Sequence, residues 1–237
     1  MDDAIEFAPR GARGRLYSAT GRVRLGDADV HGLLRLDGLA RHLQDVATDD
    51  WDDTGLDAQD VWVVRRTAIR RTTSRWPALG DAVTLTTWCA GTGAAWAERR
   101  TDLEVGGQTL LEAAALWVPT DPDGRPRRLR PTFFTVYGEA VGDRKVSGRV
   151  ARPAVDSAAR RRRWEVRRSD LDVVGHVNNA AVWSAVAEVA PEAPRAVTVV
   201  HHGALELDDE VVLAYTEHAF WLVVDGDVRV SGGFELE

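Results

Sequence analysis

A short segment in the second half of the chain concentrates the residue types that hydrolytic chemistry uses. Residues 169–179 contain a pair of aspartates ending in Asp172, the histidine His176, and the side-chain amides Asn178 and Asn179. Asp172 precedes His176 by four positions. A carboxylate so placed can orient the imidazole, or can act on water or on an acyl carbon as a base or a nucleophile. We therefore predict Asp172 and His176 as catalytic residues of a hydrolytic site.

A related segment lies earlier in the chain. Residues 26–33 carry the same Asp-x-Asp pair and following glycine as residues 169–176, at an offset of 143 positions. Leu33 stands where the second copy has His176. The chain therefore has the pattern of a diverged tandem duplication in which only the second copy has an ionisable ring. We expect Asp27 and Asp29 of the first copy to do no more than bond the backbone of a tight loop.

The residues between the histidine and the following apolar run are candidates for substrate binding. A loop that leads into a helix directs free backbone amides at whatever lies before it, so amides near Gly175 and Val177 could polarise a carbonyl oxygen. Asn178 could hold the loop and contact the substrate, although capping of the helix explains at least one of the two asparagines. We predict Gly175, Val177 and Asn178 as substrate-binding residues.

Other chemically capable residues are weaker candidates. Glu206 lies at a turn into a strand and can reach the same site if the sheet folds back, but a solvated turn charge is an equally good interpretation. The single cysteine, Cys89, lies in a strand-like run and is predicted to be buried and not catalytic. No metal site is predicted, because the adjacent His201 and His202 would point to opposite faces of a strand.

Hydrophobic periodicity predicts the same order of elements in both halves, a strand, a helix and then four strands. An Asp225-Gly226 turn should join the last two strands as a hairpin. Such a unit favours an antiparallel sheet wrapped around a helix over a parallel fold. The predicted strands are 21–25, 61–72, 82–89, 94–103 and 109–118, then 164–168, 196–202, 210–215, 219–224 and 228–234; the predicted helices are 36–47 and 180–189, the second ending near Pro191.

Composition limits the class of protein. The chain has 237 residues, 44% of them hydrophobic, and a formal net charge of −7. That charge argues against a nucleic-acid surface over the whole protein. No apolar run has the length of about 20 residues that a bilayer span needs, and the N-terminus lacks the pattern of a signal peptide. We therefore expect no membrane span and a cytoplasmic location.

The residues now carry a recognisable pattern: the chain resembles the acyl-ACP thioesterases over residues 21–237. The segment 170–179 is similar to the catalytic loop of that family. Further matches follow in the same order through the first half, at residues 26–29, 43–47, 62–66, 87–88 and 117–121. Several dispersed matches in one order are more specific than any one of them.

The resemblance implies an α+β fold, a tandem double hotdog with two antiparallel sheets, each wrapped around a central helix. It implies an N-terminal hotdog at 15–142 that forms the acyl-chain pocket, a linker at 143–159, and a C-terminal hotdog at 160–237 that carries the catalytic loop. Whether the assembly is a homodimer stays open, because a fused pair of hotdog units can complete internally what single units complete by dimerising.

Asp172 and His176 take the positions of the family's catalytic aspartate and histidine. The family usually has an asparagine two residues after that aspartate, where this chain has Val174. Valine has no side-chain donor or acceptor, so the role of that amide must move or be lost. The family's further acidic residue corresponds to Glu206 within about one position.

The implied activity is hydrolysis of fatty acyl-ACP to free fatty acid and ACP, without a cofactor. An acyl-CoA thioesterase on the same fold is the first alternative, because both substrates share the pantetheine arm. A non-catalytic acyl-thioester-binding paralogue is the second, because of Val174. Acyl carrier protein is acidic, so basic surface should receive it. The arginines at 125, 127, 128 and 160–163 are the candidates, although a solvated linker is the favoured interpretation of the 160–163 run.

Overall fold

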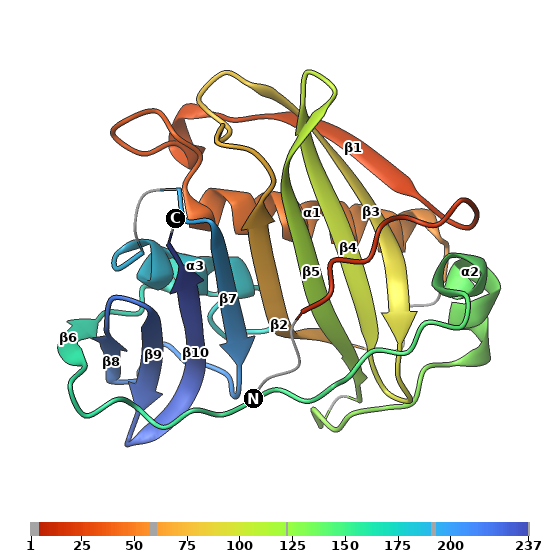
Figure 1. Ribbon diagram of the computed structural model, residues 1–237. Coiled ribbons are helices and arrows are strands. Elements are labelled where there is room, and N and C mark those ends of the chain that lie inside the picture. The colour runs from red at the N-terminus through yellow and green to blue at the C-terminus, as the bar shows by residue number, and fades with distance from the viewer. Residues whose placement is uncertain (1–4, 57–60, 122, 191–192, 237) are drawn as a thin grey trace.

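The computed structural model describes residues 5–56, 61–121, 123–190 and 193–236. Within them, ten strands form one antiparallel sheet in the order β1-β3-β4-β5-β2-β7-β10-β9-β8-β6. The helices α1 and α3 lie behind this sheet, and α2 lies beside β3, near the edge that β1 forms (Figure 1). The strands are β1 (Tyr17–Arg22), β2 (Val61–Arg71), β3 (Ala82–Thr92), β4 (Ala97–Val105), β5 (Gln108–Thr120), β6 (Arg160–Trp164), β7 (Ala196–His201), β8 (Val211–Tyr215), β9 (Ala219–Val224) and β10 (Asp227–Glu235). The helices are α1 (Leu36–Asp53), α2 (Pro131–Val141) and α3 (Asn179–Ala187), with short 3₁₀ turns η1 (Leu25–Asp27) and η2 (Arg168–Asp170).

The prediction of two separate sheets is wrong in one respect, because the two halves share a single sheet. β2 of the first half pairs antiparallel with β7 of the second, from Arg66 opposite Val200 to Arg70 opposite Ala196. An unpaired edge strand leaves a row of backbone N–H and C=O groups without partners, and joining two edges satisfies both rows. The sheet is therefore continuous across the boundary between the halves.

The duplication predicted from the sequence is visible in the order of elements. Each half contributes a strand, a 3₁₀ turn, a helix and then four strands, and the equivalent strands take equivalent places on either side of the β2–β7 junction. The helices α1 and α3 contact each other at the middle of the molecule. The hairpin turn is confirmed, since Asp225 and Gly226 both have positive φ, 49° and 85°. Pro191, which was expected to end the second helix, lies outside the described residues.

Three elements differ from the sequence-based prediction. The first strand is Tyr17–Arg22, and not the segment 21–25. The helix α2 was not predicted; it begins with Pro131 in its first turn and buries Phe133 and Tyr137 against Cys89. The first strand of the second half is Arg160–Trp164, which pairs with β8, and not the segment 164–168. Four exposed arginines therefore belong to a strand at the end of the sheet, where charged side chains discourage pairing with another chain.

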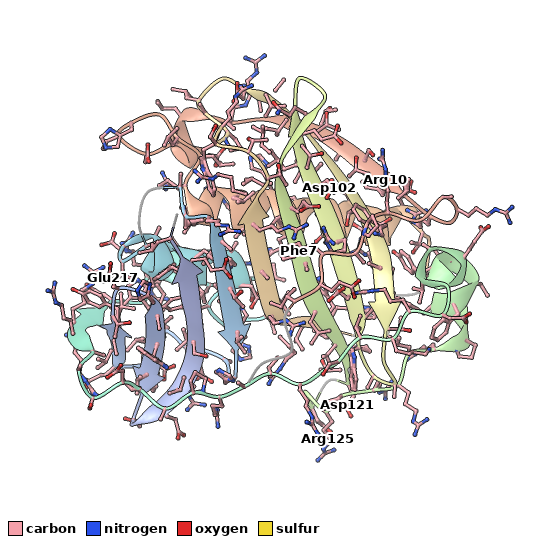
Figure 2. All side chains as sticks on the ribbon, viewed as in Figure 1. Phe7, Arg10, Asp102, Asp121, Arg125 and Glu217 are labelled. Carbon is pink, nitrogen blue, oxygen red and sulfur yellow. The ribbon has the colours of Figure 1, made fainter. Side chains whose placement is uncertain are left out.

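The outer face of the sheet is covered by chain that has no regular structure. Phe7, in the N-terminal segment, lies in front of the sheet (Figure 2), and the guanidinium carbons of Arg70 and Arg100 lie 4.2 and 4.8 Å from its ring centroid. Residues 143–159 run across the lower end of the same face from α2 to β6 (Figure 1). The opposite face packs on α1 and α3 and forms the main hydrophobic core. No helix of the described residues is long and apolar enough to cross a membrane.

Gly232 shows how closely β10 packs on its neighbours. A Cβ at this position would overlap the backbone oxygen of Thr198 and the ring of Phe220. We expect Gly232→Ala to lower the free energy of unfolding by about 1–3 kcal/mol, measured by urea denaturation, because overpacking forces the backbone to shift. Gly26→Ala is the matched control, since a Cβ there meets nothing within 4 Å. Equal stability of the two variants would contradict this description of the β7–β10 contact.

Candidate active site

The loop between η2 and α3 is a tight turn closed by its own backbone. Leu171 and Val177 form a bridge pair at its base. The amide of Asp172 donates to the carbonyl of His176 at 2.9 Å, and the amide of Gly175 donates to the carbonyl of Asp172 at 3.0 Å. Gly175 has φ 88°, a left-handed conformation that favours glycine. The loop therefore holds Asp172 and His176 opposite each other at its neck.

The side chains of these two residues are accessible. Asp172 Oδ1 accepts a hydrogen bond of 2.9 Å from the amide of Val174, whose own side chain is 61% exposed. His176 is exposed. In the part of the chain that the structure describes, no hydrogen bond joins the Asp172 carboxylate to the His176 ring. Both groups are thus available to a substrate, and their hydrogen bond to each other is not preformed.

The corresponding loop of the first half is built in the same way. Asp29 Oδ1 accepts hydrogen bonds from the amides of His31 and Leu33, at 2.8 and 2.9 Å. Asp27 forms an ion pair of 3.0 Å with Arg41. The predicted role is confirmed for Asp29. It is wrong in one respect for Asp27, which accepts from the backbone amide of Arg24 but also pairs with the Arg41 side chain. It follows that Asp172 also builds its loop, and any catalytic role is additional to that one.

The predicted binding residues occupy the start of α3. Asn178 caps the helix, because its Oδ1 accepts from the amide of Ala180 at 2.8 Å. The amide of Val177 donates to the carbonyl of Leu205 at 2.9 Å, and the amide of Gly175 is used within the loop. Contact of Gly175, Val177 and Asn178 with a substrate stays a prediction.

Glu206 lies next to this loop in space. The hydrogen bond from Val177 to Leu205 places the segment 205–206 beside the base of the loop. The backbone amide of Glu206 donates to Asp209 Oδ2 at 2.8 Å, and the Glu206 side chain is exposed. The structure therefore brings Glu206 into the neighbourhood of Asp172 and His176, without a bond between the side chains.

A cavity of about 190 Å³ lies in the first half, between the C-terminal part of α1, α2 and the sheet. Aromatic side chains dominate its lining, and they are those of Trp51, Trp62, Trp117, Phe133 and Tyr137. We call this space the aromatic cavity. Apolar cavities of this kind accept apolar ligand groups.

A smaller cavity of about 40 Å³, the inner cavity, lies where α1 and α3 meet the sheet. Arg99 and Trp117 line both cavities, so the two adjoin. Gln44 and Ala180 line the inner cavity and also an open groove of about 510 Å³ between α1 and α3. That groove includes Asn178 and other residues of the loop before α3. The three spaces therefore adjoin in a row from the surface, past the start of α3, to the aromatic cavity, and we call this row the candidate route.

Sequence reasoning missed a buried charged network beside the aromatic cavity. Asp50 is 1% exposed and accepts from Arg99 at 2.6 Å, from Arg15 at 2.7 Å and from the hydroxyl of Tyr137 at 2.9 Å. Burial raises the pKa of Tyr137 to about 12, so the phenol stays protonated and donates. A signal was present, because Asp50 falls on the helical face defined by Leu43 and Ala47.

Two other residue types are buried without a catalytic arrangement. Cys89 is 3% exposed, and burial raises its pKa to about 12, so the thiol is not a nucleophile at neutral pH. Its predicted burial is confirmed. His201 lines the inner cavity, where burial lowers its pKa to about 4 and keeps it neutral. His202 instead contacts Ser231 Oγ at 2.8 Å.

Comparison with protein families gives two successive matches, separated by residues 137–153. The acyl-ACP thioesterase N-terminal domain matches residues 14–136, and the acyl-ACP thioesterase C-terminal domain matches residues 154–219. Among curated proteins, uncharacterized protein Rv2001 of Mycobacterium tuberculosis is 26% identical over 243 residues, which cover 97% of this chain and 96% of that protein.

Solved structures agree on the fold. A putative oleoyl thioesterase from Lactobacillus plantarum superposes with a TM-score of 0.81 at 21% identity, covering 95% of this chain and 98% of that one. The 12:0-ACP thioesterase from Umbellularia californica gives 0.78 at 19% identity, with the same coverage. An acyl-ACP thioesterase from Bacteroides thetaiotaomicron gives 0.77 at 17% identity, covering 94% and 98%. At these identities the likeness shows a shared fold, the α+β double hotdog.

Proposed function

We propose, from the fact that the chain belongs to the acyl-ACP thioesterase family, that it hydrolyses the thioester of an acyl group carried on acyl carrier protein and releases the free acid. The observation that carries this proposal is the candidate route, in which the surface groove, the inner cavity and the aromatic cavity share lining residues. It passes the first turn of α3, directly after the loop with Asp172 and His176. The pantetheine arm would occupy the groove, and the acyl group would extend into the cavities.

This placement puts the thioester carbonyl at the start of α3. The first amides of a helix have no partner within it and favour negative charge. The amide of Ala180 is capped by Asn178. We assign the amides of Asn179 and Ala181 to the oxygen of the carbonyl, where negative charge develops when water attacks.

The loop residues supply the proton transfers. Asp172 is the base that activates water, and Glu206 supports that water from the neighbouring segment. His176 donates a proton to the leaving sulfur as the carbon–sulfur bond breaks, so that the carrier leaves as a thiol and the acid takes the oxygen of water. Their separation before substrate binds fits this assignment, because catalytic hydrogen bonds often tighten only in the substrate complex.

A non-catalytic acyl-thioester binder is the second candidate. Two observations favour it: Val174 has replaced the family's amide, and the Asp172 carboxylate already accepts a hydrogen bond within the loop. Such a protein would hold acyl-ACP in the same groove and cavities without turnover.

The variant Val174→Asn distinguishes a complete site from a weakened one. Because the Val174 side chain is 61% exposed at the tip of the loop, we expect kcat to change by less than about threefold, or about 0.6 kcal/mol of activation free energy. Steady-state hydrolysis of acyl-ACP measures this. A gain of a hundredfold or so from near zero would instead support the second candidate.

Basic surface for the carrier protein is present on β6. Its four arginines are exposed, and Arg162 pairs with Glu188 at 3.0 Å. Arg125, a second candidate, projects away from the sheet at the lower edge (Figure 2). We expect charge reversal at Arg161 and Arg162 to raise KM for acyl-ACP roughly tenfold, because each lost or reversed surface pair is worth up to about 1 kcal/mol.

The control for this prediction is acyl-pantetheine, which lacks phosphate and protein. Its KM should be unchanged by the reversal. An unchanged KM for acyl-ACP would remove β6 as the docking surface. The same assay with acyl-CoA tests the choice of carrier, since wild-type kcat/KM should be higher for the ACP thioester than for the CoA thioester of the same acyl group.

A further inference from the structure

Arg99 stands at the junction of the aromatic cavity and the inner cavity. It lines both, and its side chain retains 13% of its accessible surface although it lies inside the first half. Since Arg99 is a lining residue of the two cavities, that remaining surface faces them. An acyl chain that passes from the start of α3 to the aromatic cavity must therefore pass a guanidinium group.

The protein uses only some of the hydrogen-bond donors of the Arg99 guanidinium. Its Nη1 donates to Asp50 Oδ2 at 2.6 Å and to Thr87 Oγ1 at 3.3 Å. The Tyr137 hydroxyl is a further neighbour. A guanidinium has five N–H donors in a planar fork. Donors thus remain for a group in the cavities.

The inner cavity has further polar groups. Among its lining residues are Gln44, Thr67, Asn179 and His201, and His201 Nε2 is buried with no partner among the described residues. A plain hydrocarbon chain there would cover these groups and Arg99 without offering them a hydrogen bond. Covering a polar group in this way is unfavourable, most of all for a charged one.

Beyond the junction the lining changes to aromatic rings. The aromatic cavity of about 190 Å³ is slightly larger than the engineered cavity of about 150 Å³ that binds benzene. It accommodates one aromatic ring or a short alkyl end. The acyl group that fits this route is therefore polar in its middle and apolar at its end.

We propose that the acyl group recognised by this protein carries a hydroxyl or keto oxygen on the part of the chain that passes Arg99, followed by a short alkyl or aromatic end. This inference rests on the proposed thioesterase function and names its substrate class. The oxygen is neutral and not a carboxylate, because the charge of Arg99 is already matched by Asp50. Arg15, the second cation on Asp50, is in turn matched by Asp53 at 2.7 Å.

The test uses the purified full-length protein and matched acyl-ACP substrates. The series holds one unsubstituted medium-chain acyl group, the same group with a single hydroxyl at successive carbons, and the matching acyl group with a terminal carboxylate. We expect one hydroxyl position to give kcat/KM at least about tenfold above the unsubstituted chain, the ratio that a hydrogen bond to a charged group supplies. Faster hydrolysis of the unsubstituted chain than of every hydroxylated one would overturn the inference, as would a preference for the carboxylate.

A charge-neutralised pair of variants tests the assigned residue. Asp50→Asn combined with Arg99→Gln should reduce the hydroxyl preference to about one, mainly through KM. The control is Arg75→Gln combined with Asp81→Asn, which neutralises a partly exposed pair of the same half whose residues line neither cavity, and it should keep the preference. Retention of the preference in the Asp50 and Arg99 double variant would exclude Arg99 as its cause.

Failure of the proposed function has a different signature. If no thioester is turned over, hydrolysis is absent, and the substrate class is then tested by calorimetric binding of the free acids to wild-type protein. Tighter binding of the hydroxy acid than of the plain acid would support the inference, and equal or weaker binding would overturn it. This measurement needs no variant, so it stands even if the double variant fails to fold.

Discussion

Replacing His176 by alanine or Asp172 by asparagine should lower kcat for acyl-ACP hydrolysis by about 10²–10⁴-fold, the range in which a positioned acid or base contributes. Asparagine at position 172 keeps an oxygen that can accept the hydrogen bond from the Val174 amide. The variant therefore removes the charge and the basicity while preserving the loop. Single-turnover measurements should show the loss in the chemical step, with substrate binding little changed.

The internal duplication offers a matched control for this prediction. Asp29 builds the equivalent loop in the first half, where Leu33 takes the place of His176. Asp29→Asn should leave kcat within about twofold of wild type, because its carboxylate has only a backbone role. If Asp29→Asn and Asp172→Asn lowered kcat equally, Asp172 would have a structural role alone and the assigned chemistry would be wrong.

Asp50→Ala should lower the free energy of unfolding by about 3–5 kcal/mol, which is the cost of breaking a buried ion pair by removing one partner. The change would leave Arg99 inside the first half without its anion, and it would remove the acceptor of the Tyr137 hydroxyl. Urea denaturation of the purified variant measures the loss. Arg15 would keep its second partner, Asp53, so the penalty falls mainly on Arg99.

Asp53→Ala is the comparison, because the Asp53 side chain is 59% exposed and its pair with Arg15 is at the surface. Surface pairs of this kind are worth about 0–1 kcal/mol. A loss of stability below about 1 kcal/mol for Asp50→Ala would mean that water or a rearranged side chain neutralises Arg99. The guanidinium would then not be fixed at the junction of the cavities.

Local patterns in the sequence were sufficient to predict most elements of the fold. Alternation and helical spacing identified α1, α3 and the four strands that follow each helix, and the Asp225-Gly226 pair identified the final hairpin. The pairing of β2 with β7 was not predicted as a junction, because its partners are more than a hundred positions apart in the sequence. α2 was missed because it buries only one narrow face, against residues of distant strands.

The candidate site, like the fold, was predicted only in part from the sequence. The loop with Asp172 and His176 was predicted because its residues are close in sequence, and the capping role of Asn178 followed from its type and position. The cavities and the Arg99–Asp50 pair were not predicted, because residues of α1, β2, β4, β5 and α3 all contribute to them. A sequence shows which residues can react, but the space that a substrate fills depends on packing between segments far apart in the chain.

The most direct test of the account is multiple-turnover release of carrier thiol from acyl-ACP by the purified wild-type protein. We predict continuous release in large molar excess over the protein, faster for acyl-ACP than for acyl-CoA. Formation of a stable complex with acyl-ACP, without release beyond the uncatalysed rate, would contradict hydrolysis and would identify the protein as a binder of acyl thioesters.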